Sequence, residues 1–514
     1  MTLNQGGVLY KDFGEIKPPG IFFLYYGILK LFGKESIYIG LKFLALFTQV
    51  FSAFFFFKSG EILFDRKKGF YLSMFFLITL SLSYRFWPPN VMLLYFFPIS
   101  LSLYFLSLSL KKDSLWRYFL SGLMMGLSFL ISTNLFVFYL MIPLVSWKLK
   151  KNFKDFFSAS FFGGIGFLIP LFGTCVYFWL NDALTDWYWW NVKWAEIYGG
   201  AYPIWLRIWK FFYGFILTWP LFPLYVHGIV SLKKIIQGKE YQNSNKVFLI
   251  LVFFILSVCS RLLLSKGEPR YYLYLVPGFI FIAFHLNTVI KIRFVYLVSF
   301  LIMGAGFLYS FYFASQDVKA VFSKEKKEAV EWIKLNSKAE DKIFVWGEGL
   351  DYYYSTGRKM ATSFFSPNQH LDYPYLWEQN GYQDIDYPWK QFLEEIEKDK
   401  PVYIIDYSGI QGDFNQERQK SRKQPLKYYM NRFKNFVYKH YEKTKNIGTI
   451  PFYLDIKALK KMLRNRLLIE DELFLESVYQ NKKIKPDITE KEKERIKEIF
   501  ENLGYIKIWK KKNS

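Results

Sequence analysis

Three charged residues near the start of the chain have the types and spacing that chemistry at a membrane surface would need. Asp12, Glu15 and Lys17 lie in the stretch YKDFGEIKPPG, residues 10–20. A carboxylate in such a loop can act as a general base or help to hold a metal ion, and a lysine can neutralise a phosphate. A solvated loop whose charges have no role is the alternative, and spacing alone leaves both interpretations open.

A second group of charges lies near residue 265, between two apolar segments. Arg261, Lys266 and Arg270 lie at the ends of these segments, and Arg261 falls within an apolar run. An ionisable residue at membrane depth is a functional hypothesis by default. The alternative for Arg261 is that its long side chain reaches the membrane–water interface, which a position near the end of a span makes easy.

The segment 181–207 is rich in tryptophan and includes Trp189, Trp190 and Trp194. Such clusters often form an aromatic belt at the membrane–water interface, and they can also stack on the C–H faces of sugar rings. The belt is the favoured interpretation. Four scattered histidines do not favour a His-built metal site, and two cysteines within apolar runs indicate no disulfide framework.

The elements that must position these residues follow from the charge distribution. Residues 1–315 carry 29 of the 67 Lys/Arg but only 12 of the 43 Asp/Glu. Residues 316–514 carry the other 38 Lys/Arg and 31 Asp/Glu. The first part is apolar and nearly free of acids, whereas the second has the composition of an ordinary globular domain. This division argues against a soluble cytosolic enzyme.

A helix needs about 20 apolar residues to cross a bilayer core, and on that criterion the first part contains about ten candidate spans. They lie near 36–57, 69–87, 91–110, 118–132, 134–147, 156–180, 208–232, 247–264, 271–287 and 294–314. The fourth and fifth are short and could form one bent span. The predicted fold is a mainly α polytopic helix bundle followed by a soluble α/β domain.

The orientation follows from basic residues in alternate loops, because cytoplasmic loops are enriched in Lys and Arg. Five loops hold 17 of the 29: Lys58, Arg66, Lys67, Lys68, Lys111, Lys112, Arg117, Lys148, Lys150, Lys151, Lys154, Lys233, Lys234, Lys239, Lys246, Lys291 and Arg293. Residues 1–35, 181–207 and 265–270 and the tail after 315 are then exterior. No cleavable signal is recognisable at the N-terminus.

The predicted domains are an exterior loop with an interfacial helix (1–35), a transmembrane domain (36–315) and an exterior α/β domain (316–514). The interfacial helix starts at Pro18-Pro19 and stops at Gly33. In the tail we expect helices at 323–337, 426–442 and 486–503 and strands at 342–346, 402–407 and 449–454. No nucleotide-binding loop is present, and nucleic-acid binding is not expected.

Three stretches resemble a known family when they are taken in order. They are GGVLYKDFGEIKPPG (6–20) with the helix end KLFG (30–33), KGEPRYYLYLVPG (266–278), and EAVEWI (328–333) with DKIFVWG (341–347). They resemble the exterior loops and the start of the soluble tail of bacterial membrane C-type glycosyltransferases of family 39. This family includes relatives of protein O-mannosyltransferases and of the lipid A aminoarabinose transferase.

The resemblance implies a glycosyltransferase of the bacterial inner membrane. It would transfer a hexosyl or pentosyl group from a polyprenyl-phosphate donor to an envelope glycan, a lipopolysaccharide-type glycolipid or a protein hydroxyl. Asp12 and Glu15 would be catalytic. Lys17, Arg270, Arg261 and Lys266 would bind the donor phosphate, and Glu268, Tyr271 and Trp190 the substrate. No cofactor is certain, although Mg²⁺ or Mn²⁺ is compatible with the carboxylates.

The chain departs from the family at one point. Family members have a first span and then a catalytic acid about twenty residues ahead of the Lys-Pro-Pro element, whereas here only 16 residues precede Lys17. This implies a shortened chain or a lost activity. A transporter or flippase of lipid-linked sugars and a non-catalytic membrane scaffold are the alternatives. A transporter would need charges at mid-span and repeat symmetry, and the sequence shows little of either.

Overall fold

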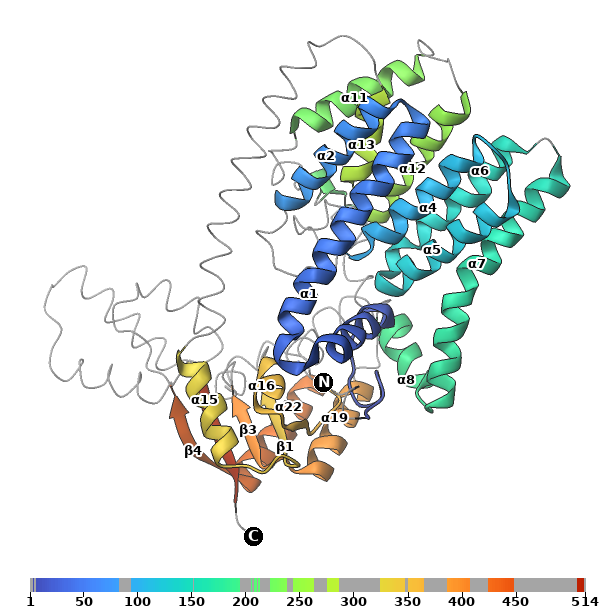
Figure 1. Ribbon diagram of the computed structural model, residues 1–514. Helices are drawn as coiled ribbons and strands as arrows, with labels where there is room; N and C mark the ends of the chain where they lie inside the picture. Colours follow the sequence, from blue (N-terminus) through green and yellow to red (C-terminus); the bar gives the residue numbers. More distant parts are fainter. Residues whose placement is uncertain are drawn as a thin grey trace, which may run out of the picture. The chain divides into compact units, whose positions relative to one another are not determined.

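The structure of the protein is a computed structural model. It describes residues 6–82, 94–150, 152–194, 222–237, 244–262, 275–285, 324–346, 350–364, 386–406, 424–447 and 506–512, together with Leu3 and five residues between 205 and 212. The chain divides into two compact units, Ile16–Val318 and Met1–Glu15 with Lys319–Ser514, here called the helical unit and the α/β unit. The fold is mainly helical with a small sheet in the tail, as the sequence predicted (Figure 1).

The first long helix, α1 (Pro19–Leu63), begins where the two prolines predict. Proline at the start of a helix lacks an N–H that would have no partner there, and its fixed φ suits the helix. The backbone leaves the helical conformation at Gly33, with φ 74° and ψ 171°. A residue without Cβ adopts this conformation at little steric cost. Gly33 therefore separates a short apolar helix, Pro19–Gly33, from the longer Ile39–Leu63. The interfacial position of the short helix stays a prediction.

The next helices form the middle of the helical unit. They are α2 (Arg66–Leu82), α4 (Phe96–Ser109), α5 (Leu115–Ile131), the 3-10 helix η3 (Thr133–Leu140) and α6 (Met141–Leu149). Ser132, between α5 and η3, has the extended conformation φ −154° and ψ 114°. The two short predicted spans at 118–132 and 134–147 are therefore separate elements and not one bent helix.

The helix α7 (Phe153–Leu180) packs closely on α5 through small residues. A Cβ added to Gly122 of α5 would collide with the carbonyl of Gly163, and one added to Gly166 would collide with the carbonyl of Phe119. Small residues allow such close approach between helices in a membrane. The opposite surface of α7 exposes large apolar side chains, among them Phe157, Phe161, Leu168 and Phe172. A surface of this kind suits contact with lipid.

The helical unit also contains α8 (Leu184–Tyr188), the π-helix η4 (Trp189–Lys193), α11 (Phe222–Ile236), α12 (Ser244–Leu262) and α13 (Val276–His285). Three helices in the described part of the chain are long and apolar enough to cross a membrane: Ile39–Leu63, Phe153–Leu180 and Asn245–Leu262. Four further apolar helices are shorter: Pro19–Gly33, Phe96–Ser109, Leu115–Ile131 and Thr133–Leu149. The predicted span at 294–314 lies outside the described residues.

The α/β unit is built on a five-stranded sheet of order β2-β1-β3-β5-β4. Its elements are α15 (Lys324–Leu335), β1 (Lys342–Trp346), α16 (Leu350–Thr356), β2 (Lys359–Met360), α19 (Asp386–Asp399), β3 (Tyr403–Asp406), α22 (Gln424–His440), β4 (Tyr441–Ile447) and β5 (Ile506–Lys511). The strand β1 pairs in parallel with β2 and β3, and β5 pairs antiparallel with β3 and β4.

Helices cover both faces of β1, which explains its nearly continuous apolar sequence. Ile343 and Val345 belong to one core together with α15 and α16. The alternate residues Phe344 and Trp346 contact Phe392 of α19 and Phe433 of α22. Successive side chains of a strand point to opposite faces, so the two helix layers lie on opposite sides of the sheet.

Most described elements of the tail match the prediction. The helices predicted at 323–337 and 426–442 correspond to α15 and α22, and the strands predicted at 342–346 and 402–407 to β1 and β3. The helix predicted to reach 442 ends at His440, because Tyr441–Ile447 pairs with Ile506–Lys511 as strand β4. The strand predicted at 449–454 and the helix at 486–503 lie outside the described residues.

Candidate active site

Residues 8–13 form a closed turn that fixes the Asp12 carboxylate. The backbone N–H of Asp12 donates to the carbonyl of Val8 (2.9 Å), and the N–H of Val8 donates to Oδ2 of Asp12 (2.7 Å). In the same turn the N–H of Tyr10 donates to the carbonyl of Phe13 (2.9 Å). The Asp12 side chain is exposed, and its Oδ1 accepts no hydrogen bond from the residues that the structure describes. One carboxylate oxygen is thus held while the other is open.

The turn contains a backbone conformation that needs support. Tyr10 has φ 69°, in the left-handed region that residues with a Cβ rarely adopt. Such a conformation costs on the order of 1–3 kcal/mol and persists where the surroundings hold it. Here the side chains of Leu9 and Tyr10 are buried. The two apolar anchors and the hydrogen bonds of the turn together make the position of Asp12 well defined.

Directly after Asp12, the turn is fastened to the segment of Ser363 and Phe364 in the C-terminal part of the α/β unit. The N–H of Gly14 donates to the carbonyl of Ser363 (2.8 Å), and Gly14 forms a parallel bridge with Phe364. Ser363 is in turn held by Glu395 of α19, whose Oε2 accepts the Ser363 N–H (2.6 Å) and whose Oε1 accepts the Ser363 hydroxyl (2.9 Å). Gln391 donates to the same carboxylate (Nε2 to Oε1, 3.0 Å).

Sequence analysis did not predict the contact between Ser363 and Glu395. Glu395 lies on an amphipathic helix, α19, and such helices usually present their acids to water. Burial raises the pKa of the Glu395 carboxyl above its usual value, although the hydrogen bonds from Ser363 and Gln391 act in the opposite direction. The one signal in the sequence that could have indicated this contact is an acid, Glu395, close to the apolar face of the amphipathic helix α19.

The three predicted residues of the first loop differ in their environments. Asp12 is exposed, whereas Glu15 is 5% exposed and therefore largely removed from solvent. Lys17 is exposed and belongs to the helical unit, just ahead of α1. Of the two carboxylates, Asp12 has the better access to a substrate.

Arg261 is enclosed within the helical unit. It lies in the last turn of α12 and is 1% exposed. A side chain that reached the interface would leave its head group in contact with water, so this burial argues against that alternative. Ionisable residues in membrane helices generally face the interior of the bundle or a cavity and mark functional positions. The binding role of Arg261 itself stays a prediction.

Trp190 packs within a cluster of its own segment. Its ring contacts Trp189 (centroids 5.1 Å apart) and Trp194 (6.2 Å), and the side chain is 1% exposed. A buried ring offers no open face to a sugar. The structure gives no support to the predicted substrate contact of Trp190, and that role stays a prediction.

Four predicted residues lie outside the described part of the chain: Lys266, Glu268, Arg270 and Tyr271. Whether Lys17 and Arg270 approach one another therefore stays a prediction. Among the described residues, no group of three His, Cys, Asp or Glu could hold a metal ion. Participation of Mg²⁺ or Mn²⁺ is likewise an untested prediction.

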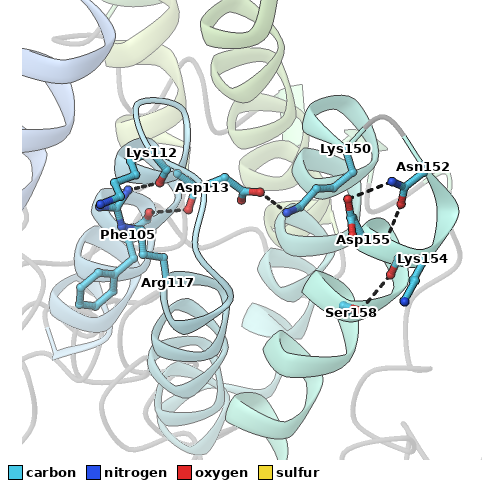
Figure 2. Close-up of polar contacts among 10 residues, drawn as sticks. Phe105, Lys112, Asp113, Arg117, Lys150, Asn152, Lys154, Asp155 and Ser158 are labelled. Atoms are coloured by element: carbon cyan, nitrogen blue, oxygen red, sulfur yellow. Dashed lines mark hydrogen bonds and ion pairs between the residues drawn. The ribbon is translucent and has the colours of Figure 1, made fainter.

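Two of the five basic loops that the sequence assigns to the cytoplasmic side meet in the helical unit. Lys150, after α6, forms an ion pair with Asp113, in the loop between α4 and α5 (Figure 2). Beside that loop, Arg117 in the first turn of α5 donates to the carbonyl of Leu108 near the end of α4 (2.5 Å). Asn152 caps α7 by accepting the N–H of Asp155 (2.8 Å). The two loops thus lie on one side of the bundle, as alternating spans require.

No family model matches the chain, and no curated protein matches it. Three similar solved structures are of the oligosaccharyltransferase of Archaeoglobus fulgidus. The structure described as AglB in complex with an inhibitory peptide and a dolichol-phosphate is 12% identical, with a TM-score of 0.47, covering 97% of this chain and 80% of that one. The structure tethered to an acceptor peptide containing the NVT sequon is 12% identical, with a TM-score of 0.49 and coverages of 98% and 81%. The apo form is 10% identical, with a TM-score of 0.45, covering 97% of this chain and 82% of that one. Structural similarity with TM-scores below 0.5 and identities of 10–12% gives no basis for assigning this enzyme's activity to the chain.

Proposed function

We propose that the chain is an integral membrane glycosyltransferase. It takes a hexosyl or pentosyl group from a polyprenyl-phosphate donor and transfers it to an envelope glycan, a glycolipid or a protein hydroxyl. The reaction takes place at the exterior face of a bacterial inner membrane, with the α/β unit in the periplasm. The apolar helices suit a donor whose lipid tail stays in the bilayer, and the sequence resemblance to family 39 supports the class of reaction.

The observation that carries the proposal is the geometry of Asp12. Asp12 is exposed; one of its carboxylate oxygens is held by the N–H of Val8, while the other accepts no hydrogen bond from the described residues. A general base needs this combination, because it must be oriented and must keep a free lone pair for the proton. Glu15 meets the requirement less well because it is buried.

The chemistry follows from this arrangement. The acceptor hydroxyl attacks C1 of the sugar and forms the new C1–O bond while the bond from C1 to the phosphate oxygen breaks. Attack from the opposite side inverts the configuration at C1. The hydroxyl proton passes to Oδ1 of Asp12. The polyprenyl phosphate leaves with the bonding electrons and gains one negative charge.

Positive charges stabilise this leaving group. Lys17 and Arg270, with Arg261 and Lys266, are the candidates, because charge that develops in the transition state is best met by fixed charges. The enclosed Arg261 has the reduced solvent exposure that strengthens such interactions. Glu268 and Tyr271 are the candidates for contacts to the sugar.

The test is Asp12→Asn in the full chain, reconstituted in proteoliposomes. Polyprenyl-phosphate hexoses and pentoses are supplied with a bacterial envelope extract, and release of polyprenyl phosphate is followed. We expect turnover to fall by about 10²–10⁴-fold, the usual contribution of a general base. Because an asparagine oxygen can still accept the Val8 N–H, the turn should persist.

Asp65→Asn is the matched control. Asp65 is also exposed and also holds a backbone N–H with its carboxylate, that of Lys68 (2.8 Å), but it lies at the predicted cytoplasmic side. Its variant should keep full turnover. Equal turnover in Asp12→Asn and wild type would remove Asp12 from the catalytic role.

A further inference from the structure

The Glu395 carboxylate binds both the backbone N–H and the hydroxyl of Ser363. Both carboxylate oxygens lie within hydrogen-bond distance of the Ser363 hydroxyl, at 2.9 and 3.0 Å, and Oε2 also accepts the Ser363 N–H at 2.6 Å. With the bond from Gln391 at 3.0 Å, the carboxylate faces three donors. Other acids of α19 behave differently: Glu397 forms a solvent-accessible pair with Arg432, and Glu394 is exposed.

Ser363, which Glu395 holds, also holds the loop of residues 8–15 that carries Asp12. The N–H and hydroxyl of Ser363 point to Glu395, while its carbonyl accepts the N–H of Gly14 (2.8 Å). Gly14 follows Asp12 by two positions, and the turn between Val8 and Phe13 is closed by its own hydrogen bonds. A continuous path of hydrogen bonds and short backbone segments therefore joins Glu395 to Asp12 within the α/β unit.

Burying a carboxylate costs free energy unless hydrogen bonds compensate for the lost hydration. Among the described residues Glu395 has no ion-pair partner, and its charged neighbour Asp399 is also negative. A glutamine offers only one acceptor oxygen and would turn its amide nitrogen toward a donor. Only a carboxylate satisfies the N–H of Ser363 and the amide of Gln391 at the same time.

We propose that Glu395 is a positioning residue which, through Ser363, fastens the loop of residues 8–15 to α19 within the α/β unit and so fixes the place of Asp12. This inference rests on the proposed function for its catalytic consequence, but its structural part stands independently. The tail domain thus contributes to the reaction by holding the loop that carries Asp12.

Hydrogen–deuterium exchange of the full chain in nanodiscs tests the structural part. In Glu395→Ala, amides of the peptide spanning residues 6–16 should exchange at least about tenfold faster, because hydrogen bonds to a charged group are lost. Strand peptides containing β1 and β3 should be unchanged. Glu394→Ala, which removes an exposed acid next to Glu395, should leave all of these rates as in wild type.

A weaker variant keeps the test decisive if Glu395→Ala disturbs the fold. Ser363→Ala removes the hydroxyl bond and keeps the N–H bond, so it should accelerate exchange of residues 6–16 by a smaller factor, while Ser363→Thr should restore the wild-type rate. Unchanged exchange of this loop in both Glu395→Ala and Ser363→Ala, with β1 and β3 protected, would overturn the proposal.

The catalytic part has a separate readout. Because positioning affects the base and not donor binding, Glu395→Ala should lower kcat by about tenfold or more and leave KM for the donor unchanged. In Asp12→Asn the same change should have no further effect. If exchange of residues 6–16 accelerates in Glu395→Ala but the wild-type chain shows no transferase activity, the fastening role holds and the proposed function is refuted. An additive loss in the double variant would refute the positioning role.

Discussion

Two carboxylates separated by two residues have different chemical prospects because of their surroundings. Asp12 is exposed and only one of its oxygens accepts a hydrogen bond from the described residues, whereas Glu15 is buried. Sequence spacing treats them as equivalent, since both lie in one polar stretch ahead of a helix. The distinction depends on the turn between Val8 and Phe13 and on its attachment at Gly14. Of the two, we therefore propose Asp12 as the base.

The titration of Glu395 predicts a pH dependence of local stability. Its pKa in the folded protein is raised above the usual 4.5, chiefly by burial and also by nearby Asp399, with Ser363 and Gln391 opposing. A raised folded-state pKa means that the stabilising contribution is complete below the unfolded pKa and is lost as the pH rises through the folded value. The free energy of opening of α19 should therefore decrease as the pH rises above about 4.5.

Exchange rates of α19 amides, corrected for intrinsic rates and measured between pH 4.5 and 7.5, provide the check. Glu395→Gln should remove this part of the pH dependence, since an amide does not titrate in this range, and Glu394→Gln should retain it. A slope that is the same in all three proteins would contradict the assignment to Glu395.

Lys17 and Arg270 provide a second prediction at the residue scale. If both contact the donor phosphate, Lys17→Ala and Arg270→Ala should each cost roughly 1.5–3 kcal/mol of transition-state binding, or about tenfold to over a hundredfold in kcat/KM. Two ligands of one phosphate should also be non-additive in the double variant. The measurement is kcat/KM for the polyprenyl-phosphate sugar.

The control for these charges is Lys30→Ala, which removes an exposed lysine of α1 whose ammonium lies over the Tyr26 ring. It should leave kcat/KM unchanged. Strictly additive effects of the Lys17 and Arg270 changes, or full activity in either single variant, would remove the idea of a shared phosphate.

At the scale of elements, the seam between α5 and α7 predicts a specific sensitivity to side-chain size. A Cβ at Gly166 would collide with the backbone carbonyl of Phe119, whereas one at Gly173 of the same helix meets no atom within 4 Å. Gly166→Ala should therefore destabilise the bundle by about 1–3 kcal/mol, the usual cost of overpacking. Gly173→Ala should be neutral or stabilising by up to about 1 kcal/mol, because alanine favours the helix.

Thermal unfolding of both variants in the same detergent measures the difference. The expected order of Tm is Gly166→Ala below wild type, with Gly173→Ala equal to or above it. If the two variants unfold at the same temperature, the close approach of α5 and α7 is not a determinant of stability.

The elements that sequence analysis predicted well are those with local signals. The helix of α1 up to Gly33 has proline at its start and glycine at its break, and β1 has a short apolar run. The strand β4 was missed because its sequence, YEKTKNI, is polar and charged. It lies at the edge of the sheet, where charged side chains discourage pairing with other chains, and its partner β5 comes much later in the sequence.

The same distinction applies to the candidate site. Asp12 and Lys17 could be proposed from a local pattern of charges and prolines. The role of Ser363 and Glu395 could not, because Gly14 meets Ser363 only through tertiary folding, and neither residue lies in a motif. The burial of Arg261 could not be predicted either, since sequence places it near a helix end without showing which residues surround it.

At the scale of the whole molecule, the charge distribution and the helices together predict the topology. The loops before α5 and before α7 meet through Asp113 and Lys150, so two strongly basic segments lie on one side of the bundle (Figure 2). Cytoplasmic loops carry such an excess of basic residues. Reporter fusions should therefore give a cytoplasmic signal at residue 150 and an exterior signal at residue 330.

These fusions are read with paired reporters that are active only on opposite sides of the membrane. A fusion at residue 113 is the matched control and must agree with the one at 150, because the ion pair places both loops together. An exterior signal at 150, or a cytoplasmic signal at 330, would contradict the orientation and remove the α/β unit from the face where the reaction is proposed.

The central claim is that the chain transfers a sugar and does not merely move its lipid carrier. The most direct test is the reaction of the purified full chain in proteoliposomes with a polyprenyl-phosphate sugar labelled at C1 and with envelope acceptors. We expect release of polyprenyl phosphate in step with labelled acceptor, inversion at C1, and loss of both products in Asp12→Asn. Movement of the intact donor across the bilayer, with no polyprenyl phosphate released from any hexose or pentose donor, would contradict this claim and indicate a flippase.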